Sequence, residues 1–141
     1  MRKVNVVIVF SEDKKRLLMC RRIFEPFKGK LNFVGGRVES GETELEAAYR
    51  ELEEETGISK NDIMLTHFMN FQYILSDIEV EAFAGKLTRG VDPVEEVNPL
   101  EWVDICGDFA VDFGDLSRFG GDGNILHMLR EIELYKDRIF G

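Results

Sequence analysis

Residues 36–58 read GRVESGETELEAAYRELEEETGI, and this stretch decides the fold more than any other part of the chain. Its positions 43–56 are rich in Glu, Leu and Ala and contain no Gly or Pro, which favours a helix. Gly57 follows directly, where a helix would end in a left-handed cap. At about 100° per residue, one face of this helix collects Leu45, Ala48, Tyr49 and Leu52. The sequence therefore predicts an amphipathic helix.

The same helix carries a cluster of carboxylates on its flank. Glu51, Glu54 and Glu55 are spaced i, i+3 and i+4, so that three like charges lie close together. Arg50 can pair with Glu54, but one guanidinium cannot balance the cluster, and carboxylates near a helix C-terminus also oppose its dipole. Clustered carboxylates suit hard divalent cations such as Mg²⁺. The simpler interpretation is a solvated, glutamate-rich surface helix.

The spacing of the fixed positions goes beyond what a surface helix needs. A glycine is followed by five free positions, a glutamate, seven free positions and a dense final series, at Gly36, Glu42, Arg50, Glu51, Leu52, Glu54, Glu55, Gly57 and Ile58. This pattern resembles that of the Nudix hydrolases, which cleave a diphosphate linked to another moiety, usually a nucleoside. The resemblance implies an α/β fold in which a mixed β-sheet is sandwiched between α-helices (an α/β/α sandwich).

The resemblance also implies roles for individual residues. Glu51, Glu54 and Glu55 correspond to metal-binding carboxylates, and the backbone carbonyl of Gly35 to an additional ligand. Arg50 would orient this cluster in the catalytic machinery. The implied cofactor is Mg²⁺, with Mn²⁺ as an alternative, because a divalent ion neutralises the phosphates and lowers the pKa of bound water.

The general base is implied less specifically. Relatives use either a glutamate of the helix, which would be Glu54, or a glutamate from a later loop. The loop sequence VEEVNPLEWV offers Glu95 and Glu96, and Glu96 lies six residues before Trp102, as in MutT-type enzymes. A solvated loop explains both residues equally well.

Substrate recognition rests on four residues suggested by the MutT-like branch. Arg22 would hold a phosphate, and Asn32 would bond a purine edge. Phe119 would stack on the base, and Asp122 would accept a hydrogen bond from it. Each has a simpler explanation: a solvated arginine, a polar residue bonded to backbone, a core aromatic and a helix N-cap, respectively.

These residues favour hydrolysis of a nucleoside triphosphate, for example an oxidised purine deoxynucleotide, to a nucleoside monophosphate and pyrophosphate. Other Nudix substrates remain open, namely dinucleoside polyphosphates, ADP-ribose and nucleotide sugars. Tyr73 lies in a region where dinucleoside-polyphosphate hydrolases have a tyrosine, although a tyrosine in an apolar strand is usually a core residue. A third interpretation is a non-catalytic nucleotide sensor.

Composition agrees with one domain over residues 1–141. The chain has 44% hydrophobic residues, including eleven Phe, which can fill a core. A net charge of −9 argues against nucleic-acid or anionic-membrane binding, since phosphate backbones are held mainly by Lys and Arg. Two cysteines are too few for a disulfide framework, so that we expect a cytoplasmic protein, with Cys20 in the core. Dimers are common among relatives, so a homodimer stays open, although nothing in the sequence pattern identifies an interface.

The remaining segments predict the other elements. Short apolar runs at 4–10 and 16–20 read as a strand pair, and 63–75 and 78–87 as a hairpin joined across Ser76 and Asp77. The run LEWVDI predicts a further strand. Apolar positions at near-helical spacing predict a helix over 124–139.

Overall fold

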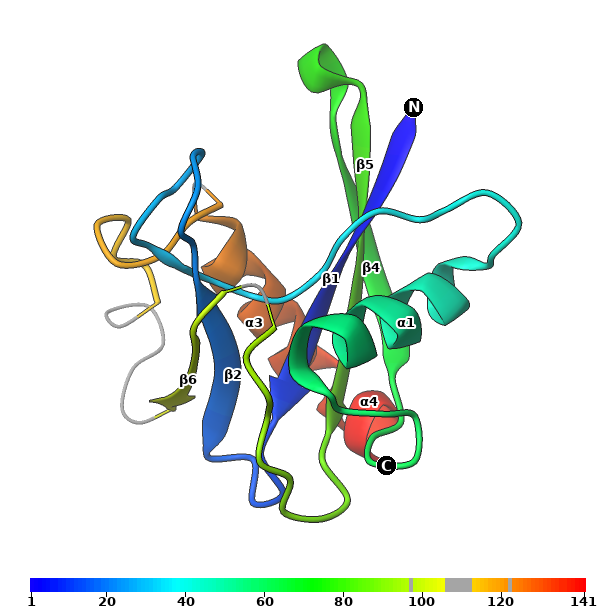
Figure 1. Ribbon diagram of the computed structural model, residues 1–141, viewed down its shortest axis with the longest axis vertical. Coiled ribbons are helices and arrows are strands. Elements are labelled where there is room, and N and C mark those ends of the chain that lie inside the picture. Colours follow the sequence, from blue (N-terminus) through cyan, green and yellow to red (C-terminus); the bar gives the residue numbers. More distant parts are fainter. Residues whose placement is uncertain (97, 106–112, 122) are drawn as a thin grey trace.

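A six-stranded mixed β-sheet forms the centre of the molecule (Figure 1). The computed structural model describes all residues except 97, 106–112 and 122. The strands are β1 (Arg2–Phe10), β2 (Arg16–Arg21), β3 (Leu31–Asn32), β4 (Thr66–Tyr73), β5 (Ile78–Lys86) and β6 (Leu100–Asp104). Their order is β3-β2-β1-β5-β4, with β6 paired to β2 outside this path. Only β1 and β5 run parallel, and the other pairs are antiparallel.

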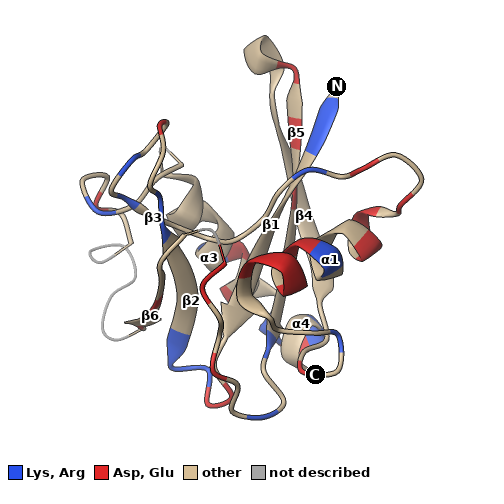
Figure 2. Cartoon of the chain, viewed as in Figure 1, with Lys and Arg blue, Asp and Glu red and all other residues tan. Residues whose placement is uncertain are grey.

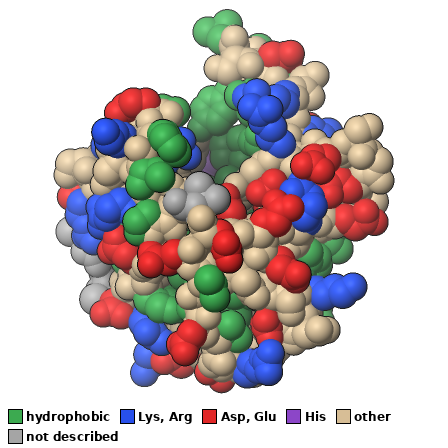
Figure 3. Space-filling model, viewed as in Figure 1, with side chains coloured by type: hydrophobic (Ala, Val, Ile, Leu, Met, Phe, Trp, Pro, Cys, Tyr) green, Lys and Arg blue, Asp and Glu red, His purple; other side chains and the backbone are tan. Residues whose placement is uncertain are grey.

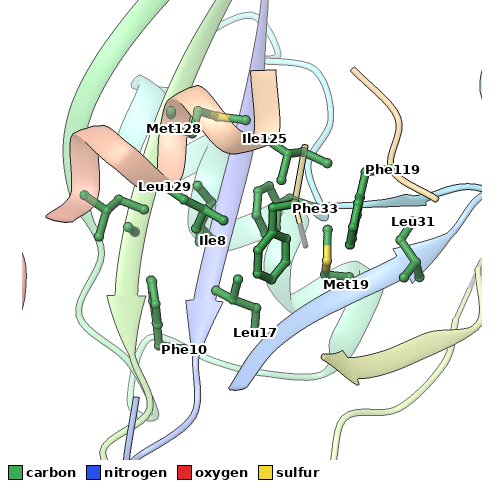
Figure 4. Close-up of a cluster of buried hydrophobic side chains, with 14 of the residues drawn as sticks. Ile8, Phe10, Leu17, Met19, Leu31, Phe33, Phe119, Ile125, Met128 and Leu129 are labelled. Carbon is green, nitrogen blue, oxygen red and sulfur yellow. The ribbon is translucent and has the colours of Figure 1, made fainter. Parts of the chain in front are cut away.

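Helices cover both faces of the sheet, which confirms the predicted α/β/α sandwich. Alternate residues of β1 serve the two sides: Val7 and Val9 pack with α1 (Glu44–Thr56), and Ile8 and Phe10 pack with α3 (Asn124–Leu134) and α4 (Lys136–Phe140). Figure 4 shows the second cluster, in which Leu129 lies next to Ile8. No helix in the described residues is both long and apolar enough to cross a membrane.

Helix α1 is fixed at both ends by its own sequence. Thr43 is the N-cap, and its hydroxyl accepts from the Glu46 amide in a capping box. Gly57 ends the helix with φ +77°, the left-handed conformation expected there. The buried face consists of Ala47, Ala48, Leu52 and Thr56. Leu45, which the periodicity placed with the apolar residues, is 42% exposed, because the helix begins beyond the edge of the underlying core.

The segment that leads into α1 runs along β1. Val34 bridges Val7, and Arg37 bridges Val4, so that Gly35 and Gly36 are held against the middle of β1. The Asn5 amide donates to the Gly36 carbonyl at 2.8 Å. The sheet thereby sets the position of the glycine pair relative to the glutamates of α1.

The predicted hairpin exists with shorter strands. A 3-10 turn (Ile74–Ser76) and Asp77 at φ +55° connect β4 to β5. Tyr73 at its tip is 39% exposed, so the expectation of a core tyrosine was wrong. The β4–β5 hairpin projects past the helices at this end (Figure 1).

The predicted C-terminal helix is interrupted. Tyr135 has φ −114° and ψ 20°, and it separates α3 from α4. Ile132 and Ile139 are buried on either side of this break, whereas Leu134 and Tyr135 are 73% and 45% exposed.

Candidate active site

The glycine pair and the end of α1 meet over the sheet. The Gly35 amide donates to Glu55 Oε2 at 3.1 Å. A Cβ atom on Gly36 would overlap the carboxylate of Glu51, and one on Gly35 would overlap the carbonyl oxygen of Asn5. These approaches explain why two glycines precede the helix, since any side chain there would displace either β1 or a predicted metal ligand.

Arg50 is the centre of the charge network on this face. Its Nε and NH2 atoms donate to the two carboxylate oxygens of Glu42 at 2.9 and 2.7 Å. NH1 donates to Glu51 at 3.0 Å and to Glu54 at 3.1 Å, and NH2 also donates to the Arg37 carbonyl at 2.9 Å. The predicted Arg50–Glu54 pair is thus confirmed. Figure 2 shows acidic residues on both sides of the basic position in α1.

The hydrogen bonds that Arg50 donates shift the pKa values of both partners. They lower the pKa of Glu42 from 4.5 to about 2, and the same bonds raise the pKa of Arg50. Glu42 takes two of the five hydrogen bonds. Glu51 and Glu54 take one each, so a single guanidinium is shared among three carboxylates.

Glu55 has a raised pKa, to which both burial and neighbouring carboxylates contribute. Burial is the main cause that raises its pKa from 4.5 to about 7, and the charges of Glu51 and Glu54 add to the shift. The hydrogen bond from Gly35 and the charge of Arg22 act in the opposite direction but do not offset it. Figure 3 shows the acidic side chains gathered on the face over α1. A cation at this place would relieve the repulsion.

The donor chemistry fits a hard divalent cation, although the side chains are arranged differently from a ligand shell. Among the described residues, no group of three or more His, Cys, Asp or Glu side chains stands ready to hold a metal ion. Glu51 and Glu54 are turned toward Arg50, and Glu55 toward the Gly35 amide. The carboxylates share one helix flank and carry oxygen donors only, which is the ligand type that Mg²⁺ prefers.

An open cavity of about 690 Å³ lies beside the C-terminal half of α1, and its walls include Glu54 and Glu96. The loop that carries Glu96 is held there because the Val94 amide donates to the Thr56 carbonyl at 2.8 Å. Glu95 instead accepts from the Leu100 amide at 2.7 Å. The structure therefore brings Glu96 to the helix that carries the motif. The other lining residues are Tyr49, Arg50, Glu53, Ser59, Lys60 and Asn61.

Glu53 and Lys60 of this cavity were not predicted from the sequence. Glu53 falls on a free position of the motif, and Lys60 follows it in a polar break. Only the folded loops show that they face the same cavity, because nothing in their local pattern distinguishes them from solvated surface residues.

The predicted substrate-binding residues are brought together in part. Arg22 follows β2, donates to the Pro26 carbonyl at 2.7 Å, and lies close enough to lower the pKa of Glu55. Asn32 Oδ1 accepts from the next amide, that of Phe33, at 3.0 Å, which matches its simpler explanation. Its Nδ2 would lie 3.0 Å from a Cβ on Gly120, so that Asn32 is adjacent to the 119–121 segment.

The structure tests the prediction for Phe119 but not the one for Asp122. Phe119 is 2% exposed and packs beside Phe113, with ring centroids 5.1 Å apart, and it lies near Leu31 and Met19 in Figure 4. This burial matches the core interpretation, since no ring face is open for a base. Asp122 lies outside the described residues, and the N-cap of α3 is Gly123.

The tip of the β4–β5 hairpin carries a further polar contact. The hydroxyl of the exposed Tyr73 accepts a hydrogen bond from the side-chain amide of Asn124, at the start of α3. The contact brings this tyrosine to the segment in which Phe119 and Asp122 were predicted to contact a base.

Comparisons with known proteins agree with this geometry. The NUDIX domain family model matches residues 1–105. The 8-oxo-dGTP diphosphatase of Escherichia coli is 28% identical over 115 residues, 80% of this chain and 89% of that protein. The ADP-ribose pyrophosphatase of Methanocaldococcus jannaschii is 47% identical over 47 residues, 33% of this chain and 28% of that protein. A Caenorhabditis elegans Ap4A hydrolase structure superimposes with a TM-score of 0.72 at 19% identity, covering 99% of this chain and 100% of that one.

Proposed function

The chain belongs to the NUDIX domain family and is a hydrolase of phosphorus-containing acid anhydrides, and we propose that it is a magnesium-dependent nucleoside triphosphate pyrophosphohydrolase. Its products would be a nucleoside monophosphate and pyrophosphate. The observation that carries this proposal is the carboxylate cluster of α1, which faces the Gly35–Gly36 pair and holds more negative charge than Arg50 can balance. Small polyphosphates are compatible with the net charge of −9, because a divalent cation can bridge acidic protein and acidic substrate.

The metal ligands would be Glu51, Glu54, Glu55 and the carbonyl oxygen of Gly35. A bound Mg²⁺, or Mn²⁺ in its place, would neutralise the phosphate oxygens and make the attacking water more acidic. Arg50 holds Glu51 and Glu54 on one side of the helix, and both carboxylates would turn from Arg50 toward the cation on binding.

The proton of the attacking water would pass to a glutamate. Water forms a new bond to phosphorus while the bond from phosphorus to the bridging oxygen breaks, and the pyrophosphate leaves in line with the attack. Glu54 and Glu96 both line the cavity beside α1, and either carboxylate can accept the proton there.

The substrate would be held by residues outside the motif. Arg22 would bind a phosphate, since it lies within electrostatic range of Glu55. Asn32 and Asp122 would bond the base, and Asn32 lies beside the segment that leads to Asp122. The burial of Phe119 favours a supporting role for this ring beneath the base site. The E. coli relative that hydrolyses 8-oxo-dGTP supports an oxidised purine nucleotide as the first substrate to test.

The direct test is phosphate and pyrophosphate release from a nucleotide panel with MgCl₂ and with a chelator. The panel contains dGTP, 8-oxo-dGTP, dATP, ADP-ribose, a nucleotide sugar and diadenosine tetraphosphate. We expect turnover of a triphosphate with Mg²⁺ and none with chelator. Turnover restricted to ADP-ribose, the nucleotide sugar or the dinucleotide would replace the triphosphate assignment and retain the hydrolase.

A second candidate function is hydrolysis of a dinucleoside polyphosphate. The exposed Tyr73, with Asn124 bonded to it, favours this alternative, because an accessible ring can stack on a second base. The third candidate function is that of a nucleotide sensor without catalytic activity. Binding of a nucleotide without turnover under any metal would favour the sensor.

A further inference from the structure

Two polar side chains are buried side by side beneath the active site. Asn5 is 3% exposed and Glu81 is 2% exposed. They are direct partners in the parallel pairing of β1 and β5, so their side chains leave the same face of the sheet. In the described part of the chain, neither Asn5 Nδ2 nor Glu81 Oε2 has a hydrogen-bond partner. Buried polar atoms of this kind are costly and rare, which points to a role other than packing.

Two other polar atoms of Asn5 are hydrogen-bonded to Gly36. Its amide donates to the Gly36 carbonyl at 2.8 Å, and its side-chain Oδ1 accepts from the Gly36 amide at 3.0 Å. Its carbonyl oxygen lies where a Cβ on Gly35 would be. The glycine pair continues the connection, since the Gly35 amide donates to Glu55. Asn5 therefore links β1, through the glycine pair, to the place where the Gly35 amide meets the Glu55 carboxylate.

The orientation of the Asn5 amide decides whether this link exists. With Oδ1 toward Gly36, the Nδ2 end of the amide lies on the other side. No hydrogen bond joins Nδ2 to Glu81 Oε2, but Glu81 is the facing residue on the adjacent strand, and its unpartnered oxygen favours the NH2 end of the amide over Oδ1 on that side. Lys3 holds the other oxygen of Glu81 at 3.6 Å and also pairs with Glu44, in the first turn of α1, at 2.8 Å.

We propose that Asn5 is a positioning residue for the reaction and that Glu81 fixes its amide so that Oδ1 faces Gly36. Neither residue touches substrate or metal. Each acts through the Gly35–Gly36 pair, which sets the position of a metal-binding carbonyl and of Glu55. This inference rests on the proposed hydrolase function, and the test separates the two.

The experiment exchanges donor and acceptor between the two strands. Asn5→Asp replaces the Nδ2 donor by an oxygen that repels Glu81, and we expect turnover to fall at least about tenfold, with a higher Mg²⁺ concentration for half-maximal rate. Glu81→Gln keeps an acceptor for Nδ2, and turnover should stay within about threefold of wild type. The double variant Asn5→Asp/Glu81→Gln again has one acceptor and one donor, so turnover should return to within about threefold of wild type.

The matched control is Asn70→Asp. Asn70 is the partner of Glu81 on the other side, in β4, so the variant places the same new carboxylate beside Glu81 without touching the glycine pair. Its turnover should equal that of wild type. Hydrogen exchange of the Gly36 amide is measured on all variants, and we expect faster exchange in Asn5→Asp and recovery in the double variant.

The outcomes are distinct. Wild-type turnover in Asn5→Asp, or no recovery in the double variant, overturns the proposal. Equal losses in Asn70→Asp and Asn5→Asp also overturn it, since charge near Glu81 alone would then be responsible. If the wild-type protein has no turnover, the proposed function fails, and the Gly36 exchange rates still decide whether Asn5 and Glu81 hold the glycine pair together.

Discussion

At the level of single residues, Glu54 is held less tightly than the other glutamates of the motif. Its side chain is 59% exposed and receives one hydrogen bond, from Arg50, whereas the Glu51 and Glu42 side chains are each 15% exposed. An exposed carboxylate with a single contact contributes little to folding. Under the proposed function, its place in the motif reflects chemistry with water and metal rather than stability.

Glu54→Gln is expected to leave the fold intact and to reduce kcat by at least about a hundredfold, because a metal ligand or base is lost. Glu53→Gln is the control, since Glu53 lines the same cavity from a free position of the motif. Both variants are compared in kcat, KM and thermal unfolding. Wild-type turnover in Glu54→Gln, with Mg²⁺ present, would remove Glu54 from the catalytic machinery.

Glu55 predicts a pH dependence of stability in the metal-free protein. Its folded pKa of about 7 lies above its ordinary value of 4.5. Its contribution to stability is therefore full below about pH 4.5 and is lost as the pH rises through 7. Glu55→Gln should match wild type at pH 4 and exceed it at pH 8 by on the order of 2 kcal/mol, allowing for partial solvent exposure.

Urea unfolding at both pH values, with chelator present, measures this difference. Gln keeps an acceptor for the Gly35 amide, so the comparison isolates the charge. A Glu55→Gln variant that is less stable than wild type at pH 8 would show that the ionised carboxylate does not destabilise the folded protein. Turnover of the same variant should fall, because stability and metal binding make opposite demands on this residue.

At the level of elements, the contact between the glycine segment and α1 is the most demanding part of the site. A Cβ on Gly36 would overlap the carboxylate of Glu51, which is the flexible end of a side chain, so the backbone need not move. Gly36→Ala should therefore lower turnover at least about tenfold by displacing Glu51, with a loss of stability below about 1 kcal/mol.

Gly90→Ala is the matched control for this variant. Its Cβ would lie 3.2 Å from Glu12 Oε1, again the end of a glutamate side chain, but far from the motif in the sequence. Kinetics and thermal unfolding of both variants are compared. Equal turnover in Gly36→Ala and Gly90→Ala would mean that the Glu51 carboxylate can be displaced from Gly36 without a loss of activity.

The elements with strong local signals were predicted well. The capping box, the glycine cap and the helical composition act within α1 itself, and they identified its bounds to within a residue. The break at Tyr135 had no such signal, because the apolar periodicity continues through it. Leu45 was misplaced for a similar reason, since periodicity gives the face of a helix but not how far the core extends beneath it.

The residues of the candidate site also differ in how well the sequence predicts them. The residues of the motif could be predicted because their spacing along one helix is a local property. Asn5 and Glu81 could not, since their adjacency arises from a parallel pairing between strands far apart in the sequence. Exposed Tyr73 and buried Phe119 show the same dependence, because each ring's burial is decided by distant segments.

At the level of the whole molecule, the acidic charge balance predicts that divalent cations stabilise the folded protein. The chain has 27 acidic and 18 basic side chains, and α1 holds several of the acidic ones on one flank. Monovalent salt screens this repulsion everywhere, whereas a site that binds Mg²⁺ stabilises the folded state alone. The two effects can be separated by comparing salts at equal ionic strength.

MgCl₂ at a concentration about a hundredfold above its dissociation constant should add about 2.7 kcal/mol to the free energy of unfolding. For a chain of this size that corresponds to a rise in Tm of roughly 5–10 °C beyond NaCl of the same ionic strength. In the double variant Glu51→Gln/Glu54→Gln the excess should vanish, although NaCl should still raise Tm as in wild type. Thermal unfolding by circular dichroism measures both. An excess that persists in the double variant would place the divalent cation elsewhere on the acidic surface, and Glu51 and Glu54 would lose their assignment as ligands.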